Sequence, residues 1–197
     1  MTDREEALKI EYELIRSDRR TLSLQIKNGK LIIRAPRRMR RADIDSFVYS
    51  HREWIEEHMD ICRERLERYR EIEPLTSEEM KELAKRAYEV IPARVEHFAR
   101  ILDVDYGRIT VRSQLTRWGS CSAKGNLSFN CLLMLAPPEV LDCIVAHELC
   151  HRKEMNHSKR FYEHLFRVYP EYHKWHTWLK QHGGELMQRN PKRQEVG

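Results

Sequence analysis

The sequence predicts a protein of the α+β class, in which two short sheets are combined with helices. Apolar and polar residues alternate between residues 8 and 36 and again between 127 and 134, which is typical of strands with one buried face. Apolar residues recur at helical spacing in the stretch between these segments and again after residue 137. Within that last helical pattern, residues 147–151 read H-E-L-C-H.

Residues from about Ala7 to Pro36 are expected to form an antiparallel β-meander. The alternating apolar positions are Leu8, Ile10, Tyr12 and Leu14, followed by Leu22, Leu24 and Ile26. Asn28-Gly29 is a typical two-residue hairpin turn, and it leads into the apolar run 31–33. The pattern therefore predicts three strands in sequential order.

Along the sequence, helices are expected before and after the strands of a second sheet. One helix is predicted from about 41 to 70, and another runs to about 102 from a capping signal at 76–79. The strands expected at 108–111 and 127–134 form a small antiparallel sheet. Pro137-Pro138 suits the start of the next helix, since the missing N–H groups cost nothing there. Gly183-Gly184 is expected to end the last helix.

These elements divide the chain into three parts. Residues 1–74 form a basic module of β-meander and helix, residues 75–188 form the domain that carries the chemistry, and residues 189–197 form a flexible polar tail.

The segment His147-Glu148-Leu149-Cys150-His151 predicts a metal site. Residues four apart on a helix share a face, so both imidazoles can bind one Zn²⁺ ion. Glu148, adjacent to the first imidazole, is placed to take a proton from a zinc-bound water. The alternative is a core helix that carries two surface histidines without a metal. Because the chain has ten histidines in 197 residues, a chance match to the H-E-x-x-H pattern is not negligible.

His157 is the candidate third ligand. A hydrolytic zinc site uses three protein ligands and one open position, and His157 follows His151 at the spacing of H-E-x-x-H-x-x-G-x-x-H peptidases. Glu154 occupies the position of the glycine in that pattern, so the turn is expected at Asn156, a residue type that tolerates a left-handed backbone. Ser158 is a candidate N-cap for the following helix. His164, His173, His176 and His182 are interpreted as surface or packing residues.

Three motifs together resemble the YgjP-like family of zinc-dependent metallohydrolases, which is grouped with M48-type, SprT-like and WLM zinc peptidases. The motifs are Arg117-Trp118-Gly119-Ser120-Cys121, His147-Glu148-Leu149-Cys150-His151 and Asn156-His157-Ser158. The resemblance covers nearly the whole chain. It implies a zincin-like core, with His147, His151 and His157 as zinc ligands and Glu148 as the catalytic base.

Arg117, Trp118 and Asn130 are candidates for substrate contact. An edge strand beside the metal helix can pair with an extended peptide. The strand expected at 127–134 would provide that edge. Trp118 would form a wall of the cleft, with packing in the core as an almost equal alternative, and Arg117 would hold an anionic group.

Composition and charge predict a cytoplasmic protein and leave its substrate open. No run reaches the length of a membrane span, the first six residues are acidic and polar rather than a secretory signal, and the five cysteines are read as reduced thiols. The first 41 residues hold twelve Lys or Arg against six Asp or Glu. The densest basic cluster, Arg34–Arg41, can contact nucleic acid or polyphosphate weakly, although a solvated face is the preferred interpretation.

Three function classes remain at the level of sequence. The first is a zinc metallopeptidase acting on a peptide or protein. The second is a zinc-dependent hydrolase of a nucleotide or phosphoanhydride, in which arginines hold the phosphates. The third is a nucleic-acid-associated protein with a structural zinc, which the intact Glu148 disfavours. The sequence does not predict the oligomeric state.

Overall fold

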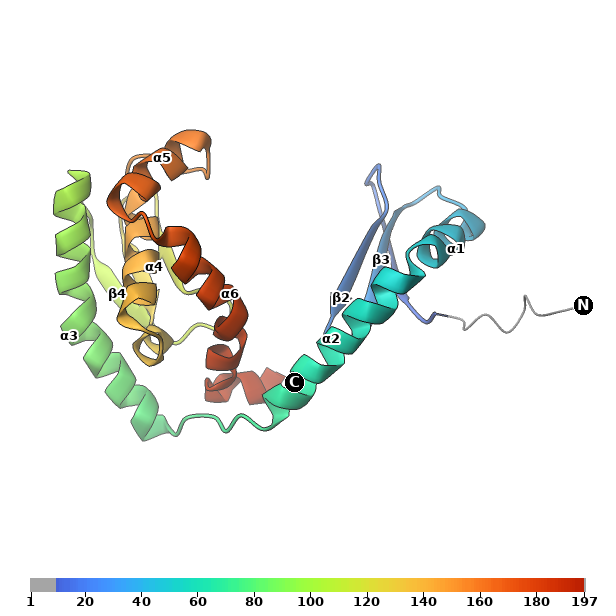
Figure 1. The fold of residues 1–197 in the computed structure, drawn as a ribbon, viewed down its shortest axis with the longest axis horizontal. Helices are drawn as coiled ribbons and strands as arrows, with labels where there is room; N and C mark the ends of the chain where they lie inside the picture. Colours follow the sequence, from blue (N-terminus) through green and yellow to red (C-terminus); the bar gives the residue numbers. More distant parts are fainter. Residues whose placement is uncertain (1–9, 197) are drawn as a thin grey trace, which may run out of the picture. The chain divides into compact units, whose positions relative to one another are not determined.

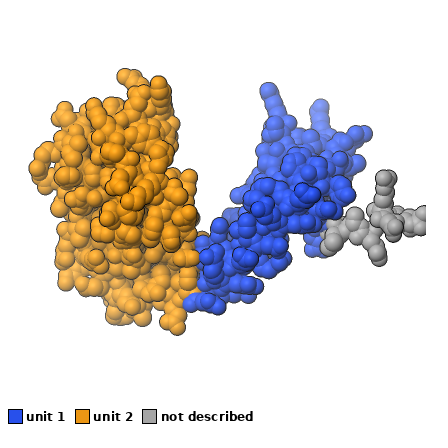
Figure 2. All heavy atoms as spheres, in the orientation of Figure 1, with its two compact units in different colours: residues 1–71 blue, residues 72–197 orange. Residues whose placement is uncertain are grey.

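The computed structural model describes residues 10–196, with side chains up to residue 193. The chain folds as two compact units, Met1–Glu71 and Ile72–Gly197 (Figure 2). Both units combine helices with a three-stranded sheet, which confirms the α+β class. The acidic first six residues and Leu8 lie outside the described residues. Between residues 10 and 196, no helix combines the length and the apolar character that crossing a membrane requires.

The first unit packs one face of its sheet against helices. Its elements are β1 (Glu13–Ser17), β2 (Ser23–Lys27), β3 (Lys30–Pro36), α1 (Arg41–Ser50) and α2 (Arg52–Arg70) (Figure 1). Alternate residues of β3 point to the buried face, and they form one cluster with α1 and α2: Leu31, Ile33, Ala35, Ile44, Val48 and Ile55. The helix predicted as one from 41 to 70 is divided at His51, whose ring nitrogen Nδ1 lies 2.8 Å from the carbonyl oxygen of Phe47.

The prediction of an antiparallel meander is wrong, because the strand order is β1-β3-β2 and β1 runs parallel to β3. The hairpin at Asn28-Gly29 is confirmed, with positive φ at both residues. It places β2 on one edge of β3 and leaves the other edge for β1. Arg16 fixes β1 there by donating to the carbonyl oxygens of Pro36, Arg37 and Met39. Alternation predicts which face of a strand is buried but not which strand lies beside it.

Much of the basic cluster 34–41 is neutralised by neighbouring carboxylates. Three of its five arginines form ion pairs, with N···O distances of 2.8 to 3.2 Å: Arg37 with Asp18, Arg40 with Asp43, and Arg41 with Asp45. The pairing lowers the net positive charge that this segment presents to a polyanion.

The second unit packs helices around a second three-stranded sheet. Its elements are α3 (Ser77–Leu102), β4 (Ile109–Arg112), β5 (Gly119–Cys121), β6 (Leu127–Asn130), the 3-10 helix η1 (Cys131–Leu135), α4 (Pro138–Cys150), α5 (Lys159–Val168), α6 (Tyr172–Gln188) and the 3-10 helix η2 (Pro191–Val196). The predicted capping signal is confirmed, since Thr76 and Glu79 exchange side-chain to backbone bonds at the start of α3. Helix α4 is buried along most of its length and lies in the centre of the unit.

The second sheet differs from the prediction in order, direction and length. Its order is β4-β6-β5, with β4 parallel and β5 antiparallel to β6, so the sheet is mixed rather than antiparallel. The strand expected at 127–134 ends at Asn130, because the Asn130 side chain accepts the N–H of Leu132 and starts η1. Because β6 is the central strand, it provides no free edge, and β4 and β5 are the two edge strands.

The C-terminal part is ordered further than the sequence suggested. Helix α6 continues through Gly183-Gly184 rather than ending there. Gly183 lies against the indole of Trp118, since a Cβ at 183 would be 3.1 Å from that ring. The tail expected to be flexible forms η2. Asn190 is fully buried and donates to Ser113 at 2.8 Å, while Arg193 donates to the carbonyl oxygen of Leu115.

Candidate metal centre and active site

The C-terminal end of α4 carries two of the three candidate ligands. Pro138 occupies the first turn of α4, as predicted, and the helix runs to Cys150. His147 therefore lies in the last turn and His151 at the cap. The carbonyl groups at a helix C-terminus carry partial negative charge, which favours a cation at this end.

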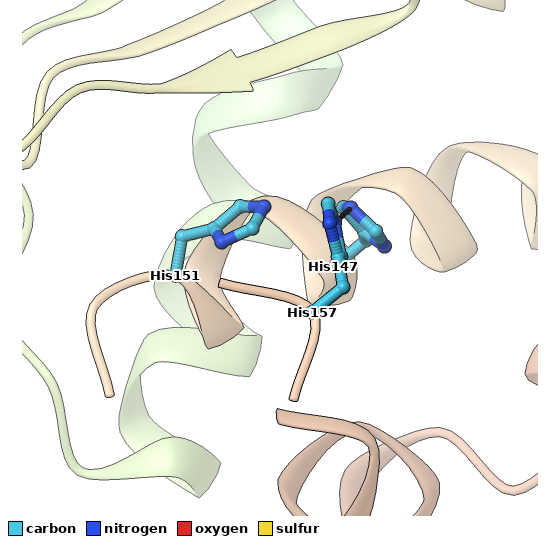
Figure 3. A group of neighbouring side chains, drawn as sticks. All are labelled: His147, His151 and His157. Carbon is cyan, nitrogen blue, oxygen red and sulfur yellow. Dashed lines mark hydrogen bonds between the residues drawn. The ribbon is translucent and has the colours of Figure 1, made fainter. Parts of the chain in front are cut away.

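The third imidazole comes from the segment between α4 and α5, and all three meet. The ligand atoms offered by His147, His151 and His157 lie within 4.8 Å of one another (Figure 3). The Nε2 atoms of His147 and His157 are 3.0 Å apart. Among residues 10–196, no other group of three or more His, Cys, Asp or Glu side chains has this arrangement.

The turn that brings His157 back is built differently from the prediction. Asn156 does not have a left-handed backbone: positive φ occurs only at Asn28 and Asp103 among the non-glycine residues described. Instead, the carbonyl oxygen of Cys150 accepts the N–H groups of both Lys153 and Glu154 at 3.0 Å, which reverses the chain with ordinary backbone angles. Ser158 then caps α5 by accepting the N–H of Phe161, as predicted.

Two basic side chains anchor this turn to neighbouring loops. Arg152 donates to the carboxylate and carbonyl oxygens of Asp105, and Lys153 donates to the carbonyl oxygen of Asp103. The guanidinium of Arg152 lies directly on Gly125, where a Cβ would be 2.9 Å from Cζ. Gly125 has φ of +80°, a backbone conformation that favours glycine.

Each helical imidazole uses Nδ1 for a bond within the protein. His151 Nδ1 lies 3.2 Å from the carbonyl oxygen of Glu154, and His147 Nδ1 lies 3.3 Å from the hydroxyl of Tyr172. Such partners orient metal-binding histidines and leave Nε2 for the ion. The ring of Phe161 is fully buried, and its centroid lies 4.8 to 5.0 Å from the centroids of all three imidazoles. It therefore packs against the whole cluster.

Sequence reasoning missed the roles of Phe161 and Tyr172. Both residues lie at regular apolar positions of their helices, where packing in the core is the expected role. The one available signal was the phenol of Tyr172, because a buried hydroxyl needs a hydrogen-bond partner.

Burial holds the helical imidazoles in the neutral form that binds metals. Burial, followed by the neighbouring imidazoles, lowers the pKa of His147 to about 3. Burial also lowers the pKa of His151 below its usual value. Both rings are therefore neutral at physiological pH, and no proton has to leave them before a cation binds.

The side chain of Glu148 packs closely against the edge strand β5. A Cβ at Gly119 would be 2.6 Å from Oε1 and 2.7 Å from Cγ of Glu148, so only glycine fits there. The backbone N–H of Cys121 donates to the carboxylate. Burial raises the pKa of Glu148 to about 7, against the opposing effects of this hydrogen bond and of Arg117. A carboxyl group with this pKa can exchange a proton near neutral pH.

The three candidate substrate residues have different surroundings. Arg117 is exposed, and its charge acts on Glu148. Trp118 is partly buried and packs on Gly183 of α6. Asn130 is fully buried, and its amide donates to the carbonyl oxygens of Gln114 and Arg117. Asn130 therefore holds the loop that carries Arg117 and Trp118.

The donor set fits a tetrahedral cation with one open position. Three nitrogen ligands about 2.0–2.1 Å from a zinc ion would be separated by roughly 3.3 Å from one another, a spacing that the three rings reach with small side-chain movements. No fourth Cys, His, Asp or Glu among the described residues joins the cluster. A site with three ligands and an adjacent buried carboxylate is the arrangement of a metallohydrolase.

Comparison with known proteins identifies the family. Residues 20–81 and 75–182 match the YgjP-like, metallopeptidase domain family, and the chain belongs to this family. It is therefore a metal-dependent hydrolase of the peptidase type, which confirms the resemblance seen in the sequence. No curated protein matches the chain.

Two crystal structures resemble part of the fold, and both are of metallopeptidase zymogens. Jannalysin of Methanocaldococcus jannaschii is 22% identical over 46% of this chain and 94% of its own, with a TM-score of 0.42. Abylysin of Pyrococcus abyssi is 23% identical over 51% of this chain and 98% of its own, with a TM-score of 0.43.

Proposed function

We propose that the domain spanning residues 75–188 hydrolyses peptide bonds with one zinc ion bound by His147, His151 and His157, and with Glu148 as general base. The observation that carries the proposal is the convergence of three imidazoles beside the buried carboxyl group of Glu148, with no fourth protein ligand among the described residues. Zinc suits this donor set, because it accepts three imidazole nitrogens and keeps a position for water.

Glu148, the proposed base, is positioned to accept a proton. A bound zinc ion supplies Lewis acidity and lowers the pKa of a coordinated water. Glu148 receives the proton on its carboxylate and then delivers it to the leaving amine. The N–H of Cys121 and the close contact with Gly119 restrict the carboxylate to one position throughout.

The edge of β5 supports a peptide as the substrate. In the antiparallel β5–β6 pair, Trp118 and Ser122 bond toward the partner strand, so the backbone groups of Gly119 and Cys121 point away from it. The carbonyl oxygens of these two residues therefore lie at the free edge beside Glu148, where an extended peptide can pair with them. Arg117, at the start of the same segment, can contact a carboxylate of the peptide.

A substrate screen with a matched variant tests the proposal. Zinc-loaded protein is incubated with unfolded proteins, a peptide library and nucleoside triphosphates, and products are detected by mass spectrometry. We expect cleavage of peptides, and Glu148→Gln should retain zinc while losing activity on the order of a hundredfold or more. Hydrolysis of nucleotides without peptide cleavage, or full activity in Glu148→Gln, would overturn the proposal.

A further inference from the structure

Tyr172 joins α6 to the metal centre. It is the first residue of α6 and only 3% exposed, and its hydroxyl lies 3.3 Å from Nδ1 of His147. Its backbone is fixed on both sides, since its N–H donates to Tyr169 and its carbonyl oxygen accepts the thiol of Cys143. The phenol ring is stacked on His176 with a centroid separation of 4.9 Å, which restrains it from turning away from His147.

The requirement for this contact follows from the two nitrogens of imidazole. Nε2 of His147 points toward the other ligands, as its 3.0 Å distance from His157 Nε2 shows. A nitrogen that binds a cation offers its lone pair, so the proton of the neutral ring must be on Nδ1. That buried N–H then needs an acceptor, and the oxygen of Tyr172 is in position to be one.

His151 shows the same arrangement with a different partner. Its Nδ1 lies 3.2 Å from the carbonyl oxygen of Glu154, a group that can only accept. The proton of His151 is thereby fixed on Nδ1 by the backbone. His147 has a hydroxyl instead, which is part of a side chain and can be removed by substitution. The contribution of its partner can therefore be measured without altering the backbone.

We propose that Tyr172 is a positioning residue for the metal centre: its hydroxyl oxygen accepts the Nδ1–H of His147 and holds this ring with Nε2 directed at the ion. The proposal rests on the proposed function, because it assumes that His147 is a ligand. It predicts that metal affinity depends on a hydroxyl group on α6, outside the segment that contains the three histidines.

The experiment compares two variants that each lose one phenolic oxygen. Tyr172→Phe keeps the ring and removes the acceptor, and zinc affinity is expected to fall about tenfold to a hundredfold. Tyr162→Phe is the matched control: the Tyr162 ring lies 6.4 Å from that of His157, and the described residues show no bond from its hydroxyl to a ligand nitrogen. Affinity is measured by competition with a chelator, and thermal unfolding of both variants is recorded beside it.

A second measurement uses the unaltered protein. In zinc-loaded wild type, nitrogen-15 NMR of the imidazoles should show the proton of His147 on Nδ1 in slow exchange with water. In Tyr172→Phe that proton should exchange faster, while the His151 signal stays unchanged.

The outcomes separate this inference from the proposed function. If wild type binds no zinc, the proposed function fails. If wild type binds zinc and Tyr172→Phe binds it equally well, or if Nδ1 of His147 carries no proton, the role of Tyr172 is overturned while the three-histidine site stands. Equal loss of affinity in Tyr162→Phe would also overturn it, because a specific hydrogen bond would then not be the cause.

Discussion

Replacing Gly119 by alanine is expected to inactivate the protein without removing its metal. A Cβ at this position would lie 2.6 Å from Oε1 and 2.7 Å from Cγ of Glu148, whereas ordinary contacts begin at 3.4 Å. The carboxylate must therefore move by roughly 1 Å, and a displacement of that size costs about a hundredfold in rate. This loss corresponds to about 2.7 kcal/mol in the activation barrier.

The assay measures kcat and KM on the best peptide substrate, together with zinc content. We expect kcat to fall and zinc content to stay near that of wild type, because residue 119 contacts Glu148 and not the imidazoles. Ser120→Ala is the control, since the next side chain along a strand points to the opposite face. Full activity in Gly119→Ala would refute the idea that the position of Glu148 against Gly119 matters for the reaction. Loss of zinc would show that the effect does not act through Glu148.

Three further changes test the ligand set, the anchoring of the turn and the burial of the base. His157→Ala should lower zinc content well below one ion per chain by elemental analysis, and an unchanged content would remove His157 from the site. Gly125→Ala should lower the free energy of unfolding by about 2 kcal/mol in urea denaturation, because an L residue is strained at its φ of +80°; an unchanged midpoint would contradict this. In metal-free protein, burial raises the pKa of Glu148 from 4.5 to about 7. Protonation of Glu148 therefore stabilises the folded state fully below pH 4.5, and this stabilisation is lost as the pH rises through 7. Between pH 4.5 and 7, the free energy of unfolding of wild type should therefore fall by about 3 kcal/mol relative to that of Glu148→Gln. Parallel plots of unfolding free energy against pH for the two proteins would contradict the prediction.

Local signals in the sequence predicted the elements that begin or end with a specific side chain. The prolines before α4, the capping residues Thr76 and Glu79 of α3, and the N-cap Ser158 of α5 all act within one helical turn. The positions of His147 and His151 on α4 follow from helical spacing alone. In these cases a residue and its partner are neighbours in sequence, so no knowledge of the fold is needed.

Long-range contacts account for what the sequence did not predict. Strand β5 has only three residues, Gly-Ser-Cys, which carry no periodic pattern, although it forms the edge beside Glu148. The partner of β1 depends on bonds made by Arg16 some twenty residues further along the chain. Tyr172 is 25 residues from His147, and only the packing of α6 on α4 brings its hydroxyl to the ring.

The three proposed ligands lie within the eleven residues from His147 to His157. The proposed base, Glu148, is held in place by Gly119 and Cys121 of a separate strand. On this proposal, metal binding and the positioning of Glu148 depend on different segments of the chain. We therefore expect that a partly folded or damaged molecule in which α4 and its turn stay intact holds zinc even when β5 is misplaced. Metal content is consequently a poor measure of the active fraction of a preparation, and titration with an active-site inhibitor is the sounder standard for comparing variants.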